Sequence, residues 1–140
     1  MSAIRVILDT GPLVAYLIKR EVHHEWALQH FAKLPAPFYT CEPVIAECSY
    51  LLKDIPRGIS TLMALLQRRQ IAIPFSLDSE KESVTTLLQK YADVPMSLAD
   101  ACLVRMSEQM GDSVICTLDS DFRVYRKHQR QVIPLIIPAV

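Results

Sequence analysis

Glycine is scarce in this sequence, with three residues in 140, and the chain has no low-complexity tract, no serine- or glycine-rich linker and no internal repeat. Because 51% of the residues are hydrophobic, the composition argues against a disordered polypeptide. The length is sufficient for one sizeable core and too short for two ordinary domains. We therefore expect a single domain over residues 1–140.

An excess of one charge is also missing, because 15 basic residues balance 15 acidic ones. A broad positive field of the kind that drives nonspecific nucleic-acid binding is excluded, so any such binding must be local. No apolar run approaches the roughly 18 residues of a membrane helix, and no Lys- or Arg-flanked apolar segment opens the chain. We expect a cytoplasmic protein with no membrane association.

Several motifs with known chemistry are absent. The four cysteines lack close C-x-x-C spacing, which favours buried thiols over disulfides or zinc ligands. The sequence contains no P-loop, no G-x-G-x-x-G turn and no G-x-S-x-G elbow. These absences argue against a nucleotide-fuelled motor and a serine hydrolase.

Short apolar segments alternate with segments of helical periodicity. Strands are expected at 4–8, 38–41, 71–73, 113–118 and 132–137, and helices at 13–18, 25–34, 43–53, 59–69, 79–91 and 97–110. Ser79 with Glu82 matches a capping box at the start of one helix, and Pro134 restricts the last strand to a sheet edge. Apolar strands between helices predict an α/β fold with a mostly parallel sheet covered on both faces.

Acidic residues interrupt this apolar pattern at five positions: Asp9, Glu47, Asp100, Asp119 and Asp121. Asp9 and Asp119 follow predicted strands, at the sheet edge where ligands of such folds bind, and the two helical acids should lie on the same side. Glu47 lies within an apolar stripe, and neither Glu47 nor Asp100 has a basic residue three or four positions away. Inward carboxylates without a cation are costly, so their convergence favours a bound metal.

Most of these acids also have a local explanation. Asp9 before Thr-Gly-Pro suits a turn or an N-cap, and Ser97 with Asp100 resembles a capping box. The acids at 119 and 121 suit a loop with an N-cap. Glu47 has no comparable explanation, which favours a joint site.

The ligand set contains carboxylates without a nearby His or Cys. Such oxygen ligands suit Mg²⁺ or Mn²⁺ rather than zinc. Mg²⁺ held by a few carboxylates commonly meets phosphate oxygens, where it activates a water and neutralises developing charge. The residues therefore predict phosphodiester hydrolysis.

Four segments, taken in order, carry a family resemblance: VILDTGPL (6–13), VIAE (44–47), SLADA (97–101) and TLDSDF (117–122). Their order and spacing resemble the PIN-domain family, and within it the VapC-type ribonuclease toxins of bacterial and archaeal toxin-antitoxin pairs. The resemblance implies a three-layer α/β/α sandwich with a central sheet of four to five strands. It also implies a Mg²⁺ or Mn²⁺ site, endonucleolytic cleavage of RNA and a cognate antitoxin protein.

The resemblance assigns roles to individual residues. The positions that match the catalytic, metal-binding acids are Asp9, Glu47, Asp100 and Asp119, with Asp121 as an auxiliary metal ligand. Thr10 and Thr117 match hydroxyl positions that could orient a carboxylate or a metal-bound water. A homodimer is expected by resemblance, and because helices 25–34 and 59–69 have more apolar surface than one short sheet can cover.

Basic residues follow the last acidic motif at Arg123, Arg126, Lys127 and Arg130. They could hold an RNA backbone beside the site, and a solvated helix face fits the pattern equally well. Two other functions stay open. One is a noncatalytic binding domain of the same fold. The other is an aspartate-dependent phosphatase. This function is less favoured, because Gly11 stands where such enzymes have a second Asp.

Overall fold

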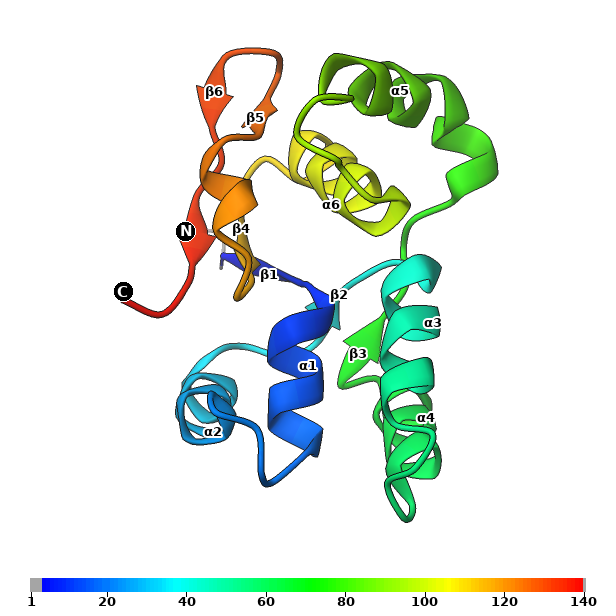
Figure 1. Cartoon of the computed structure of the whole chain (residues 1–140), viewed down its shortest axis with the longest axis vertical. Helices are drawn as coiled ribbons and strands as arrows, with labels where there is room; N and C mark the ends of the chain where they lie inside the picture. Colours follow the sequence, from blue (N-terminus) through cyan, green and yellow to red (C-terminus); the bar gives the residue numbers. More distant parts are fainter. Residues whose placement is uncertain (1–3, 140) are drawn as a thin grey trace.

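Within residues 4–139, which the computed structural model describes, a five-stranded parallel sheet forms the middle layer (Figure 1). The strand order is β3-β2-β1-β4-β7, and every neighbouring pair is parallel. The predicted parallel sheet is therefore confirmed. Its strands are β1 (Arg5–Leu8), β2 (Phe38–Tyr39), β3 (Ile71–Ala72), β4 (Ser113–Cys116) and β7 (Leu135–Ile136).

Helices cover both faces of this sheet, as Figure 1 shows. They are α1 (Thr10–Leu17), α2 (His24–Lys33), α3 (Glu42–Leu51), α4 (Gly58–Gln67), α5 (Leu77–Lys90) and α6 (Leu98–Gln109). Across the described part of the chain, none of the helices combines the length and the hydropathy needed to span a membrane.

The sheet separates two apolar layers. Val6 and Leu8 of β1 pack with α1, α2 and α4, whereas Ile7 between them packs with α5 and α6. Helix α3 contributes to both layers, with Val44 on one side and Cys48 on the other. Because both faces of the strands are buried, the strands are apolar at successive positions. The four cysteines are buried and free, as predicted.

The spatial order of the strands in the sheet places a crevice beside β1. The chain adds β2 and β3 on one side of β1 and then returns to its other side with β4. Strand order reverses at this point, and ligands of open α/β sheets bind beyond the carboxyl ends of the strands there. Leu8 and Cys116 are paired at those ends, so the residues that follow them meet at the crevice.

The C-terminal segment differs from its prediction. The single strand expected at 132–137 is divided at Pro134, because this residue has no N–H to give to a ladder. Only its second half, β7, joins the main sheet, at the edge. Before Pro134, Val132 belongs instead to β6 (Gln131–Val132), which begins one residue before the expected strand and pairs antiparallel with β5 (Arg126–Lys127) as a separate hairpin.

The start of α5 also differs from its prediction. The Ser76 hydroxyl accepts a hydrogen bond from the Ser79 N–H at 3.2 Å, so Ser76 is the N-cap and Ser79 lies inside the helix. Phe75, immediately before the cap, is buried. The capping box inferred from Ser79 and Glu82 is therefore wrong.

Candidate functional site

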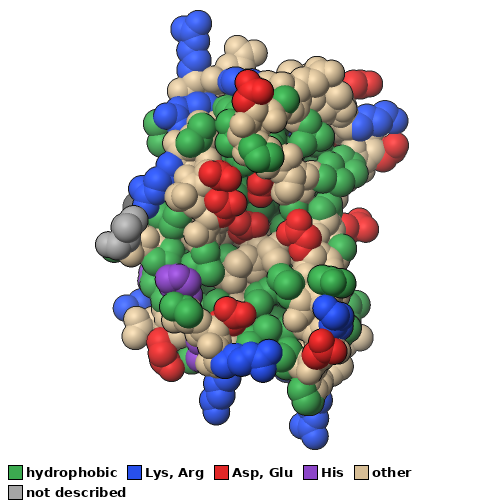
Figure 2. Space-filling model, viewed as in Figure 1, with side chains coloured by type: hydrophobic (Ala, Val, Ile, Leu, Met, Phe, Trp, Pro, Cys, Tyr) green, Lys and Arg blue, Asp and Glu red, His purple; other side chains and the backbone are tan. Residues whose placement is uncertain are grey.

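A hollow of about 600 Å³ lies at the carboxyl ends of β1 and β4. Figure 2 shows acidic side chains gathered near the middle of the visible face, with basic side chains mostly toward its edges. Four of the five predicted acids line the hollow: Asp9, Glu47, Asp100 and Asp119. Asp121 is not one of its lining residues. The acids come from four different parts of the chain, so only the fold brings them together.

Asp9 follows β1 and is the N-cap of α1. Its Oδ1 accepts a hydrogen bond from the Thr10 N–H and its Oδ2 accepts one from the Thr117 hydroxyl, both at 2.7 Å. Burial, together with the smaller effect of the charges of Asp100 and Asp119, raises the pKa of Asp9 to about 6 in spite of these donors. Asp9 is therefore both the N-cap of α1 and a residue that lines the acidic hollow.

Glu47 lies in the second turn of α3 and is exposed, although the sequence suggested an inward position within an apolar stripe. The reason is that α3 stands at the border of both apolar layers, so a residue of its stripe can open onto the crevice between them. Its Oε1 accepts a hydrogen bond from the Thr10 hydroxyl at 2.7 Å. Thr10 thus links the start of α1 to the acid of α3.

Asp100 lies in the first turn of α6 and forms the capping box with Ser97 that its spacing indicated. Its Oδ2 accepts hydrogen bonds from the Ser97 N–H at 3.3 Å and from the Tyr125 hydroxyl at 3.1 Å. Burial raises the pKa of the Asp100 carboxyl, and these donors oppose that effect. Sequence reasoning missed Tyr125, because no local pattern relates a residue near the C-terminal hairpin to α6.

Asp119 follows β4 and is the N-cap of the short 3-10 helix η1 (Ser120–Arg123). Its Oδ1 accepts a hydrogen bond from the Asp121 N–H at 2.8 Å, and its own N–H donates to the Thr117 hydroxyl at 3.0 Å. Thr117 thereby connects Asp119 to Asp9. The two hydroxyls suggested by the family pattern, Thr10 and Thr117, both contact carboxylates of the hollow.

The four basic residues that follow Asp119 in the sequence divide into two kinds. Arg123 and Arg130 are exposed. Arg126 folds back, and its guanidinium donates to the carbonyls of Arg123, Val124 and Tyr125 at 2.7–3.1 Å. Lys127 is buried, with its Nζ 3.4 Å from the Ser107 carbonyl, which does not fit a contact with an RNA phosphate. The solvated helix considered for these residues is instead a 3-10 turn followed by a hairpin.

The donor chemistry of the hollow fits a hard divalent cation. Its potential ligands are carboxylate and hydroxyl oxygens, and it includes no His or Cys side chain. As the side chains are placed within residues 4–139, no three His, Cys, Asp or Glu side chains stand close enough to hold an ion.

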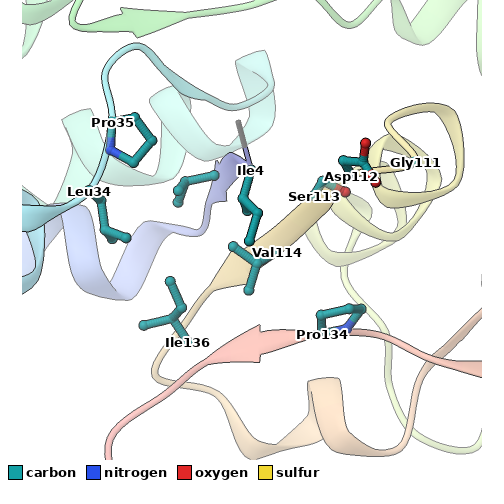
Figure 3. Close-up of a pocket in the computed structure, with 10 residues that line it drawn as sticks. Ile4, Leu34, Pro35, Gly111, Asp112, Ser113, Val114, Pro134 and Ile136 are labelled. Carbon is teal, nitrogen blue, oxygen red and sulfur yellow. The ribbon is translucent and has the colours of Figure 1, made fainter. Parts of the chain in front are cut away.

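A larger hollow of about 900 Å³ lies at the opposite, amino ends of the strands (Figure 3). Its walls are mainly apolar and include Leu34, Val114 and Ile136, with Asp112 and Ser113 at one side. Among the described residues that line it, titratable side chains do not form a cluster. Size therefore does not identify the chemical site, and the acidic hollow at the strand-order reversal remains the candidate.

Comparison with protein families gives a match to the PIN domain over residues 6–128. The crystal structure of VapC20 from Mycobacterium tuberculosis, described as a sarcin-ricin-loop-cleaving toxin, is similar to this structure with a TM-score of 0.76 and 19% sequence identity. The similarity covers 92% of this chain and 99% of that chain. A comparison with curated protein sequences gives no match. Because the family match spans most of the sequence and includes all four acids of the hollow, the chain belongs to the PIN domain family.

Proposed function

We propose that this protein is a Mg²⁺- or Mn²⁺-dependent endoribonuclease and the toxin component of a toxin-antitoxin pair. The observation that carries the proposal is the meeting of Asp9, Glu47, Asp100 and Asp119 at one hollow, at the strand-order reversal of a PIN fold. The description of VapC20 as a sarcin-ricin-loop-cleaving toxin supports a nuclease activity for a chain of similar fold.

The four carboxylates would hold the cation, and Asp121, which follows Asp119 by two residues and lies outside the lining of the hollow, would be the auxiliary ligand that the family resemblance suggests. A bound Mg²⁺ or Mn²⁺ would activate a water and neutralise the charge that develops on the phosphate. The protein contributes orientation. Thr117 holds Asp9, Thr10 holds Glu47, and the Asp121 N–H holds Asp119, so each of these carboxylates keeps a fixed direction toward the hollow.

The partners follow from the same proposal. The RNA substrate would enter the acidic hollow, with exposed Arg123 and Arg130 as candidate phosphate contacts. A small antitoxin protein would neutralise the activity. We place the protein in the cytoplasm, where four free, buried thiols are stable. A neighbouring gene that encodes a DNA-binding protein with a disordered tail would support the existence of an antitoxin. If cells tolerate expression of this protein equally well with and without the neighbouring gene, the antitoxin is contradicted.

A homodimer is also part of the proposal. On the α3–α4 side, Tyr50, Leu51, Ile59 and Met63 are exposed by 45–65%, and Leu28 of α2 is exposed by 38%. Apolar surface of this kind favours association with a second copy. A single species of 15.9 kDa in sedimentation at micromolar concentration would overturn this part of the proposal.

The test of the activity uses carboxamide variants. We predict that Asp9→Asn, Glu47→Gln and Asp100→Asn each reduce Mn²⁺-dependent cleavage of a labelled RNA by about 100-fold or more, because each loses a charged ligand worth several kcal/mol of charge stabilisation. Asp93→Asn is the matched control, since Asp93 is exposed and does not line the hollow. Binding of RNA without cleavage by the wild-type protein would instead favour the noncatalytic alternative.

A further inference from the structure

The carboxylate of Asp100 is fixed from outside its own helix. Its Oδ2 accepts one hydrogen bond from the Ser97 N–H, which belongs to the capping box, and a second from the Tyr125 hydroxyl, 25 residues later in the chain. The capping box orients the acid relative to α6 only. The tyrosine orients it relative to the segment that follows Asp119, and so relative to the rest of the hollow.

Tyr125 is itself rigid. It is fully buried, and its ring makes edge contacts with Phe122 at 5.2 Å and with Tyr91 at 5.1 Å between ring centroids. The Tyr91 hydroxyl in turn accepts a hydrogen bond from the Arg126 N–H at 2.9 Å. A side chain that is already immobilised by packing loses little further entropy when it holds another group in place.

The hydroxyl is also a lasting donor. A tyrosine phenol has an ordinary pKa of about 10, so it is protonated and can donate across the neutral range. Both donors contact the same oxygen, Oδ2, so the other oxygen of Asp100 is left for a ligand in the hollow.

We propose that Tyr125 is a positioning residue that holds the Asp100 carboxylate in the direction needed for cation binding. This inference rests on the proposed metal-dependent function. It completes a pattern in the site, because each acid of the hollow then has a donor from a different part of the backbone or core. Thr10 and Thr117 donate to two of these acids, the Asp121 N–H donates to Asp119, and Tyr125 donates to Asp100.

A purely structural role is the competing explanation, in which a buried hydroxyl uses Asp100 as a convenient acceptor. The two roles differ in what Tyr125→Phe changes. Phenylalanine keeps the ring and its packing and removes the hydroxyl alone. Under the structural role, cation affinity is unaffected. Under the positioning role, cation affinity falls by about 10- to 100-fold, as it does for outer partners of metal ligands in general.

The experiment measures Mn²⁺ affinity by electron paramagnetic resonance of the free ion, in wild type, Tyr125→Phe and Tyr91→Phe. Tyr91→Phe is the matched control, because it removes a hydroxyl from the same aromatic cluster that contacts a backbone N–H and no acid. We predict weaker Mn²⁺ binding for Tyr125→Phe and unchanged binding for Tyr91→Phe. RNA cleavage by Tyr125→Phe should return toward the wild-type rate as Mn²⁺ is raised to saturation.

A third comparison separates coupling from a general loss of order. In an Asp100→Ala background, Tyr125→Phe should cause no additional loss of Mn²⁺ affinity, because its effect passes through the missing carboxylate. Equal Mn²⁺ affinity in wild type and Tyr125→Phe would overturn the inference and leave the proposed function intact. A wild-type protein that binds no Mn²⁺ and cleaves no RNA would overturn the proposed function itself.

Discussion

Asp9 is the residue on which burial and charge conflict most directly. It is 7% exposed, and the described residues provide it with hydrogen bonds rather than an ion pair. Two donors to one carboxylate normally lower its pKa, yet burial raises the pKa of Asp9 to about 6. In the metal-free protein, the carboxylate is therefore ionised at neutral pH at a cost in stability. A cation in the hollow would remove this cost.

The pKa of Asp9 makes a prediction about stability in the absence of metal. Because its pKa is higher than the ordinary value of 3.8, the folded protein holds the proton more tightly than the unfolded chain does. The stabilisation is present below about pH 4 and is lost as the pH rises through about 6. A shift of this size corresponds to about 3 kcal/mol at most. Asp9→Asn carries no charge, so its stability relative to wild type should increase over this interval.

Urea unfolding in EDTA, from pH 4 to pH 8, measures this difference. The amide also loses one of the two acceptors that Thr10 and Thr117 require, which adds an offset that does not vary with pH. The slope of the difference against pH is therefore the informative quantity. A difference that stays constant from pH 4 to pH 8 would contradict a raised pKa for Asp9.

The sequence can indicate a residue of the candidate site only when the neighbouring residues in the chain form a recognisable pattern around it. The four acids were recognisable because each follows a strand or stands in a helix without a basic neighbour. The partner of each acid was less accessible. Thr10 and Thr117 adjoin acids in the family motifs, whereas Tyr125 reaches Asp100 across 25 residues by a contact that only the folded chain creates.

At the scale of elements, the helices and the longer strands followed from apolar periodicity. Their boundaries and the C-terminal hairpin did not. β5 and β6 are two residues each, and a pairing so short gives no alternation to detect. Glu47 was expected to face inward and is instead exposed. The apolar stripe shows which face of the helix is apolar, but it does not show that this face borders a crevice.

The corrected start of α5 gives an element-scale prediction. Ser76 accepts the Ser79 N–H, so Ser76→Ala leaves that donor without its cap and should cost about 1 kcal/mol of stability. Ser79→Ala should change stability by less than about 0.5 kcal/mol, because this exposed residue lies inside the helix. Urea unfolding at pH 7 compares the two variants. A larger loss for Ser79→Ala would restore the capping box that the sequence suggested.

At the scale of the whole molecule, the charges balance, whereas the proposed function requires an acidic hollow to receive an anionic polymer. A net positive field cannot supply the attraction, so binding would depend on the cation and on a few basic side chains near the hollow. Arg126 and Lys127 are engaged with backbone carbonyls. Arg123, at the end of η1, and Arg130, in the turn between β5 and β6, are the exposed members of the group.

We predict that replacing Arg123 and Arg130 together with Ala weakens RNA binding to a similar extent for different sequences, because phosphate contacts do not read bases. Two lost contacts should reduce the slope of log affinity against log salt concentration by about 1.4, the value expected for single strands. Fluorescence anisotropy with labelled RNA across a salt series measures this slope. Every variant is prepared in the Asp9→Asn background so that the RNA stays intact.

Arg68 and Arg69, exposed at the end of α4, provide the control pair. Their replacement by Ala removes the same charge from a different part of the surface, so it separates a local contact from a general change in net charge. If both double variants lower the slope equally, the attraction is a property of overall charge. If only the control pair lowers it, the RNA approaches over α4, and Arg123 and Arg130 belong to a solvated surface.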